Sequence, residues 1–159
     1  MTQHDFSRRS FLIAGAAFGA LAGLPVAASD APLEIHVMKD PNCGCCSAWI
    51  EILEAEGFKV TTETSFGTAL SRYKLDNGIP ARMASCHTGK IAGYMIEGHV
   101  PPADIRALLK ARPDAVGLSV PGMPYGSPGM GPEDQREAYN VYLIGRDGGA
   151  TVFNSYPAA

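Results

Sequence analysis

The sequence predicts an α/β fold in which a mixed sheet is flanked by helices. Two kinds of segment alternate along the chain. Short runs with alternating or β-branched residues are typical of strands, and segments whose apolar residues recur every three to four positions are typical of helices. The chain has 159 residues, 46% of them apolar and 18% charged, and a net charge of −3, which fits one packed domain. Because nucleic-acid-binding proteins normally carry a basic surplus, this charge argues against a nucleic-acid partner.

The predicted elements follow one another with short turns between them. They are a strand at 33–38, a helix at 46–56, a strand at 58–61, a helix at 68–76, a strand at 83–86, a strand at 91–97 and a helix at 101–110. Gly57 ends the first helix, and Thr88-Gly89 is the turn expected between the third and fourth strands. The first crossover favours parallel pairing, and the later hairpin favours antiparallel pairing.

The last part of the chain predicts a loop followed by a hairpin. Residues 113–131 are rich in Pro and Gly and nearly free of charge. Two short strands, Tyr139–Ile144 and Thr151–Phe153, then flank the turn Asp147-Gly148-Gly149.

This order of elements resembles the thioredoxin-like (glutaredoxin-like) architecture. The cysteine cluster at 43–46 stands where the first strand passes into the first helix. Pro80 precedes the predicted third strand, where that fold keeps a cis-proline beside the reactive cysteine. An ordinary trans proline at the strand entry is the alternative, since most X–Pro bonds are trans.

The first 28 residues predict a twin-arginine signal peptide. Arg8-Arg9 is followed by an apolar run rich in Ala and Gly at 13–24 and by small residues up to Ala28. Basic, apolar and small segments in this order are typical of export signals, whereas a membrane span needs about 20 apolar residues. We therefore expect a periplasmic protein without a membrane span in its mature form, with its domain at 33–159; an uncleaved anchor helix is the alternative.

Cys43-Gly44-Cys45-Cys46 is the most informative motif. At a helix start, free backbone N–H groups and the helix dipole favour thiolate over thiol. Thiolate is both the nucleophile of disulfide exchange and a soft metal ligand. A redox enzyme needs only the pair Cys43 and Cys46, so three thiols within four residues favour a metal.

Cys86 is the fourth thiol, and it can complete a four-sulfur site if its strand runs beside the first strand. The alternative is structural, with two disulfides, or one disulfide and two inert thiols.

Histidine and methionine residues extend the candidate site. His87 follows Cys86 directly, and His99 precedes the third predicted helix; each is a candidate ligand. Met123 and Met130 stand in a repeated Pro-Gly-Met in the uncharged segment Val120–Met130, the methionine loop. Their thioethers are either ligands for a soft metal or part of an apolar lid. We expect Trp49 to pack under the first helix and screen the cluster from water.

Three metal chemistries fit a four-cysteine set. Zinc accepts four thiolates in a closed tetrahedral site, and iron–sulfur clusters also use four cysteines. Cu(I) favours thiolate together with thioether and can share bridging sulfurs. The methionine loop and the export signal favour copper as Cu(I), in a multinuclear cluster if sulfurs are shared.

Four motifs together resemble the CopG-type copper-resistance proteins, a family of envelope metal-binding proteins. They are Asp40–Trp49, Ser85–Thr88, Gly93–Pro101 and Val120–Met130, within a resemblance that runs from Leu33 to Phe153. The resemblance implies a thioredoxin-like fold, a role in copper tolerance, and copper bound by Cys43, Cys45, Cys46 and Cys86. It implies auxiliary roles for His87, His99, Met123 and Met130.

Two functions follow as hypotheses. The first is a periplasmic Cu(I)-binding protein in copper resistance that couples copper redox cycling to its thiols, with copper ions and other periplasmic copper-handling or redox proteins as partners. The second is a metal-free thiol–disulfide oxidoreductase, in which Cys43 attacks and Cys46 resolves. These residues leave open whether binding or catalysis is the main activity.

Overall fold

The computed structural model describes residues 32–159, so the predicted signal peptide at 1–28 lies outside the described residues. The strands are β1 (Leu33–Lys39), β2 (Phe58–Thr64), β3 (His87–Ile91), β4 (Tyr94–Glu97), β5 (Gly117–Ser119), β6 (Tyr139–Ile144) and β7 (Ala150–Tyr156). The helices are α1 (Gly44–Ala55), α2 (Gly67–Asp76) and α3 (Pro102–Ala111), with short 3-10 turns η1 (Ala81–Met83) and η2 (Glu133–Gln135). Within this part of the chain, none of the helices has the length and apolarity that a bilayer crossing requires.

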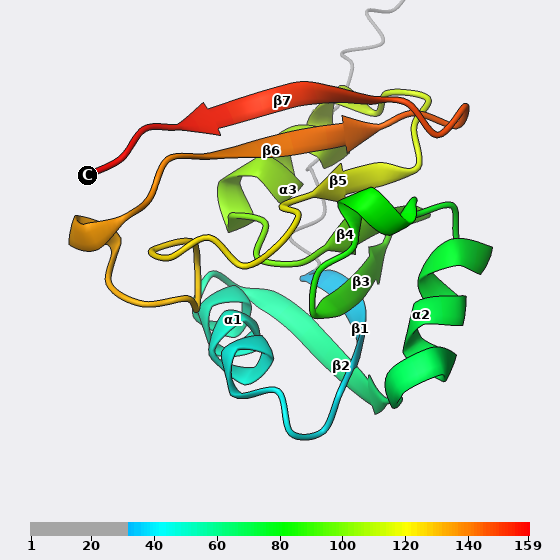
Figure 1. The fold of residues 1–159 in the computed structure, drawn as a ribbon, viewed down its shortest axis with the longest axis horizontal. Coiled ribbons are helices and arrows are strands. Elements are labelled where there is room, and N and C mark those ends of the chain that lie inside the picture. Colours follow the sequence, from blue (N-terminus) through cyan, green and yellow to red (C-terminus); the bar gives the residue numbers. More distant parts are fainter. Residues whose placement is uncertain (1–31) are drawn as a thin grey trace, which may run out of the picture. The chain divides into compact units, whose positions relative to one another are not determined.

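All seven strands belong to one sheet, in the order β2-β1-β3-β4-β5-β6-β7 (Figure 1). The pairs β1–β2 and β4–β5 are parallel, and the other four pairs are antiparallel. Each parallel pair is connected through a helix, α1 in the first case and α3 in the second, as parallel strands require. The predicted mixed sheet with flanking helices is confirmed.

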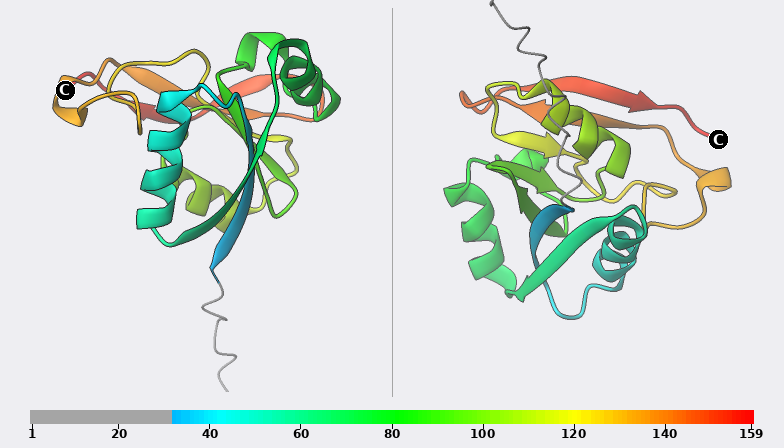
Figure 2. Two further views of the ribbon diagram at one scale, coloured as in Figure 1. Left: turned by 90° about the horizontal axis from the view of Figure 1, so that it is seen from below. Right: turned by 180° about the vertical axis from the view of Figure 1, so that it is seen from behind.

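The helices cover both faces of the sheet. Trp49, Ile50 and Leu53 of α1 share one apolar core with Ile105 and Leu108 of α3. A smaller cluster on the other face joins α2 to β4 and β6 through Tyr73, Met95 and Ile144. Figure 2 shows this separation, with α1 and α3 on one side of the first four strands and α2 on the other.

The predicted turn of the β3–β4 hairpin was wrong. The turn lies at Ala92-Gly93, where both residues have positive φ (47° and 88°), the backbone that a two-residue hairpin turn with the right twist needs. Gly89 instead lies inside β3, where a Cβ would come within 2.7 Å of Ile35 Cδ1. Gly89 therefore makes room for the core side chain of Ile35 and does not form a turn.

The cis-proline expected at Pro80 does not occur, and the alternative trans form does, although Pro80 does not enter a strand. Residues 32–159 contain no cis peptide bond, and Pro80 precedes the 3-10 turn η1, with φ −65°. The third strand therefore begins at His87 rather than at Met83. A proline supplies the φ that a helical turn needs at its start, and this use competes with strand entry.

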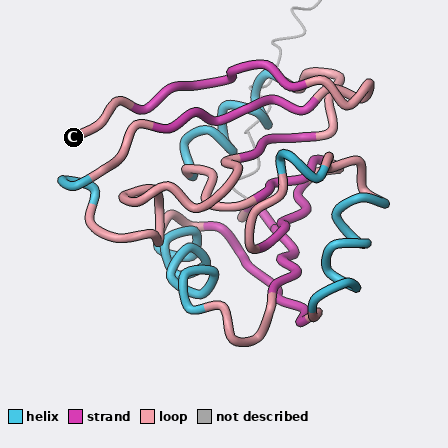
Figure 3. The backbone as a smooth tube through the Cα atoms, in the orientation of Figure 1, coloured by secondary structure: helices cyan, strands magenta, loops and turns pink. Residues whose placement is uncertain are grey.

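The Pro/Gly-rich segment contains one strand that the sequence did not predict, β5, of three residues. After β5 the chain runs as a long loop, from Val120 to Ala138 apart from η2, before the β6–β7 hairpin (Figure 3). This loop returns toward the start of α1, and its contacts there are part of the candidate site.

Candidate metal centre

Three cysteines stand at the start of α1, one as its N-cap residue and two in its first turn. Cys43 is the N-cap residue, and its sulfur accepts a hydrogen bond from the backbone N–H of Cys46 at 3.3 Å. The turn before the helix is closed by Asp40, whose carbonyl accepts from the Cys43 N–H at 3.1 Å and whose Oδ1 accepts from the Asn42 N–H at 2.8 Å. A helix N-terminus carries a partial positive charge, so this position favours thiolates, as expected from the sequence.

Two of the four cysteines form a disulfide. Cys43 and Cys46 are joined, with their Cα atoms 5.3 Å apart, while Cys45 and Cys86 are free thiols. The alternative with two disulfides does not occur in the structure, whereas one disulfide together with two free thiols does. Because the disulfide pair is the Cys-x-x-Cys pair, the structure shows the oxidised form of the dithiol that the sequence singled out.

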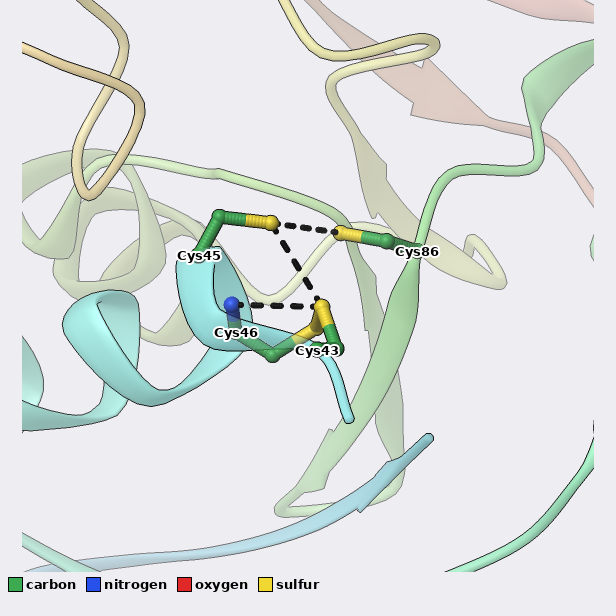
Figure 4. Close-up of side chains that lie close together, drawn as sticks. All are labelled: Cys43, Cys45, Cys46 and Cys86. Atoms are coloured by element: carbon green, nitrogen blue, oxygen red, sulfur yellow. Dashed lines mark hydrogen bonds between the residues drawn. A yellow bond between two sulfur atoms is a disulfide. The ribbon is translucent and has the colours of Figure 1, made fainter. Parts of the chain in front are cut away.

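The four sulfur atoms nevertheless meet in one place. Cys45 Sγ lies 3.4 Å from Cys43 Sγ and 3.9 Å from Cys86 Sγ, and all four sulfurs lie within 4.8 Å of one another. Figure 4 shows Cys86 reaching toward Cys45 from the segment that leads into β3, opposite the start of α1. This convergence depends on the pairing of β3 with β1, which brings residue 87 beside residue 39 at the end of β1.

Two histidines contact the fourth thiol. His87 Nδ1 lies 3.3 Å and His99 Nε2 lies 3.1 Å from Cys86 Sγ. His99 Nδ1 lies 2.8 Å from the Pro128 carbonyl, which can only accept, so Nδ1 carries the hydrogen and Nε2 faces the thiol. Cys86, His87 and His99 form a second group whose ligand atoms lie within 4.8 Å of one another.

The surroundings of the two histidines favour their neutral form. His87 is fully buried against the Trp49 ring, with ring centroids 4.3 Å apart, and its Nε2 has no hydrogen-bond partner. Burial lowers the pKa of His87 well below its usual value, helped by the nearby His99, and burial also lowers the pKa of His99. A neutral imidazole keeps the lone pair that a metal ligand needs.

The Cys86 thiol is held protonated by the same environment. Burial, followed by the neighbouring Cys45, raises the pKa of Cys86 to about 12. A bound cation reverses this preference, because a coordinating thiol loses its proton to the metal. The pocket therefore favours thiolate at Cys86 only when positive charge is present.

Trp49 closes the site from the core side, as its spacing in the sequence predicted. Its side chain is fully buried, and its Nε1–H donates to the Val100 carbonyl at 2.9 Å. The indole thus ties α1 to the residue that follows His99.

The methionine loop lies over the start of α1. Besides the Pro128 contact with His99, Gly129 packs so closely that a Cβ there would lie 2.7 Å from Trp49 N and 3.1 Å from the Cys45 carbonyl oxygen. Met130 follows directly and is half-buried, while Met123 is 54% exposed. The loop is therefore beside the site, and the assignment of either thioether as a ligand stays a prediction.

A buried polar network, which the sequence did not predict, lies behind Cys86. Lys74 of α2 and Glu97 of β4 form an ion pair with 2.5 Å between Nζ and Oε1, and Thr88 hydrogen-bonds to both. Burial raises the pKa of Glu97, and the Lys74 ammonium opposes that effect. A lysine in a polar helix and a glutamate in a short strand give no sequence signal of this kind, since each is ordinarily exposed.

Two solved structures are similar to this chain over nearly all of their own length. They are described as "Copper resistance protein copG- Form 1" and "Copper resistance protein copG- Form 2", with 51% and 52% identity and TM-scores of 0.75 and 0.74. The matches cover 80% and 79% of this chain and 99% of each solved chain. The chain belongs to the CopG copper-resistance family.

A family model, described as "Protein of unknown function, DUF411", matches residues 83–130 of this CopG-family chain. No curated protein gives a significant match. The matched segment begins just before Cys86 and ends at Met130, so it contains the fourth thiol, both histidines and the methionine loop, but not the three cysteines of α1. In this CopG-family member, the site is thus built from the helix start and the matched segment together.

Proposed function

We propose that the protein binds Cu(I) through Cys43, Cys45, Cys46 and Cys86 and serves copper resistance in the periplasm. The observation that carries this proposal is the convergence of four sulfur atoms within 4.8 Å of one another. Sulfurs only 3.4 and 3.9 Å apart suit metal ions that share bridging thiolates, which Cu(I) accepts. Solved relatives described as copper resistance proteins support copper over zinc or an iron–sulfur cluster.

Full use of this site requires the reduced protein. The Cys43–Cys46 disulfide takes up two electrons and two protons from a dithiol reductant to give two thiols, which then lose their protons to the metal. His87 and His99, both neutral, and the thioethers of Met130 and Met123 are the further ligands that we propose. Coupling of copper redox cycling to these thiols belongs to the same proposal.

The scaffold of this site is, we infer, thioredoxin-like. The order β2-β1-β3-β4 and the cysteine cluster at the start of the helix after β1 support this assignment. The hairpin β6–β7 and β5 extend the sheet beyond that unit.

Copper titration tests the proposal directly. The mature protein is purified anaerobically, reduced, and titrated with Cu(I) against a chromogenic Cu(I) chelator. We expect Cys45→Ser to weaken Cu(I) binding by about 10-fold or more, because it removes the sulfur between Cys43 and Cys86. Ser47→Ala is the matched control, since Ser47 stands on the same helical turn and only contacts the Cys43 carbonyl at 3.5 Å. Wild-type binding no tighter than that of a Cys43→Ser/Cys46→Ser variant contradicts the proposal.

The second candidate function is a metal-free thiol–disulfide oxidoreductase. The Cys43–Cys46 disulfide at a helix N-terminus favours it, because this position stabilises the attacking thiolate. It predicts turnover of a disulfide substrate that survives both a copper chelator and Cys45→Ser. Loss of Cu(I) binding in Cys45→Ser without loss of such turnover would show both activities in one protein.

The periplasmic location is tested separately. Arg8→Lys/Arg9→Lys changes the twin-arginine pair, and we expect the protein to stay in the cytoplasmic fraction as an uncleaved precursor. An unchanged distribution between the fractions contradicts export by this route.

A further inference from the structure

An ion pair lies buried behind Cys86. The side chains of Lys74 and Glu97 are 6% and 0% exposed, with 2.5 Å between Nζ and Oε1. Removing two charges from water is costly, so a buried pair of this kind is weak evidence for stability as such. Its placement suggests a different role.

The Glu97 carboxylate holds both sides of the Cys86-His87 dipeptide. Oε1 also accepts a hydrogen bond from the backbone N–H of Ser85 at 2.6 Å, and Oε2 accepts from the Thr88 hydroxyl at 2.6 Å. The Thr88 oxygen in turn accepts from Lys74 Nζ at 2.9 Å. Both carboxylate oxygens are therefore occupied by donors within the protein, and Glu97 is not placed to act as a metal ligand.

The segment that carries Cys86 is otherwise held by hydrogen bonds at its ends, from the Ala84 N–H to the Ala81 carbonyl and from the Ser85 hydroxyl to the Gly122 carbonyl. Residues 84–86 lie between η1 and β3, outside the hydrogen-bonding ladder of the sheet. The residue after Glu97 also contacts this segment, because a Cβ on Gly98 would lie 2.6 Å from Ser85 Oγ. The next residue, His99, contacts the Cys86 sulfur. Three consecutive residues at the end of β4 thus hold the backbone and the thiol of residues 85 and 86.

We propose that Glu97, with Lys74 as its counter-ion, is a positioning residue that fixes Cys86 Sγ opposite the thiols of α1. The metal-binding part of this inference rests on the proposed function. Groups that orient metal ligands without touching the metal commonly change metal affinity by about 10- to 100-fold when they are removed.

Two double variants separate the charge of the pair from its hydrogen-bond acceptor. Lys74→Met/Glu97→Gln removes both charges but keeps a side-chain oxygen for the Ser85 N–H and an amide for the Thr88 oxygen. Lys74→Met/Glu97→Leu removes both charges and the acceptor. Neither variant leaves a buried charge without its partner, and apolar replacement of a buried ion pair is often tolerated.

The first readout needs no copper. In the oxidised protein, Cys45 and Cys86 are the two free thiols of the four cysteines, with sulfurs 3.9 Å apart, so a short bifunctional thiol reagent cross-links this pair. We expect cross-linking to be about 10-fold slower in the leucine variant, because a displaced Cys86 thiol has a lower effective concentration at Cys45. We expect nearly wild-type rates in the glutamine variant. Mass spectrometry of the peptides identifies the linked residues.

The second readout is Cu(I) affinity of the reduced proteins. We expect a loss of about 10- to 100-fold in the leucine variant and a loss below about threefold in the glutamine variant. Wild-type cross-linking rates in a folded leucine variant overturn the proposal. If wild-type protein fails to bind Cu(I), the proposed function is wrong, and the cross-linking rates still decide whether Glu97 positions Cys86.

A milder pair of variants decides the question if the leucine variant does not fold. Thr88→Val removes the hydroxyl that links Glu97 to Lys74, and Thr88→Ser keeps it. We expect slower cross-linking of Cys45 with Cys86 in the valine variant and wild-type rates in the serine variant. Equal rates in the two variants overturn the proposal.

Discussion

The close contact between the methionine loop and α1 gives a prediction with a matched control. Gly129 and Gly122 lie on the same loop with similar positive φ, +83° and +72°. A Cβ at Gly129 would lie 2.7 Å from Trp49 N, whereas a Cβ at Gly122 has no atom within 4 Å. Substitution by alanine therefore strains the backbone at both positions and creates a clash at only one.

The magnitudes follow from these two contributions. A left-handed backbone costs an L-residue about 1–2 kcal/mol, so we expect Gly122→Ala to lower the free energy of unfolding by that amount. Gly129→Ala adds the cost of overpacking against backbone atoms, about 1–3 kcal/mol more. If the loop moves away instead, the contact of Pro128 with His99 is lost, and we expect Cu(I) binding to weaken more in Gly129→Ala than in Gly122→Ala.

Urea unfolding of the copper-free, reduced proteins measures the first effect, and chelator competition measures the second. Equal urea midpoints and equal Cu(I) affinities for the two alanine variants would refute the reasoning, because they would show that the loop does not rest on the start of α1.

Two further predictions concern hydrogen bonds of aromatic side chains outside the cysteine cluster. Trp49→Phe should lower the free energy of unfolding by about 1–3 kcal/mol, because the buried Val100 carbonyl loses its donor; an unchanged urea midpoint contradicts this. Tyr156 donates to Asp104 Oδ2 at 2.8 Å, and burial, with the help of that carboxylate, raises the pKa of Tyr156. The folded protein holds the Tyr156 proton more tightly than the unfolded chain does. The protonated Tyr156 hydroxyl therefore stabilises the folded state below about pH 10, and this contribution is lost as the pH rises above that value. Tyrosinate absorbance and urea midpoints between pH 9 and about 12 should show a weaker alkaline loss in Tyr156→Phe; an identical loss in the two proteins would contradict the assignment.

The parts of the fold that the sequence predicted well are those with local signals. Apolar spacing placed all three helices within two residues, and alternation placed β1, β6 and the core of β2. The position of the cysteines at a helix start depends only on residues 40–46, and it was predictable for that reason. The position of Cys86 required the pairing of β3 with β1, which the order of elements suggested.

The errors arose where a long-range contact decided the local structure. Gly89 has the residue type of a turn but lies in β3, because Ile35 from the neighbouring strand fills the space where a side chain would be. Lys74 and Glu97 come from segments 23 residues apart in the sequence, and only the tertiary fold buries them together. Neither contact has a signal within a window of the length of one helix or strand.

The Cys43–Cys46 disulfide and the proposed four-thiolate metal site use the same sulfurs, so the two states exclude each other. While Cys43 and Cys46 share a disulfide, their sulfurs cannot act as thiolates, so the oxidised protein offers only Cys45 and Cys86. If the reduced protein binds Cu(I) with four thiolates, each bound ion stabilises the reduced form by mass action, and the potential of the Cys43–Cys46 couple must rise with the copper concentration. If both proposed functions hold, a copper-dependent potential follows from the shared sulfurs and connects the two within one site.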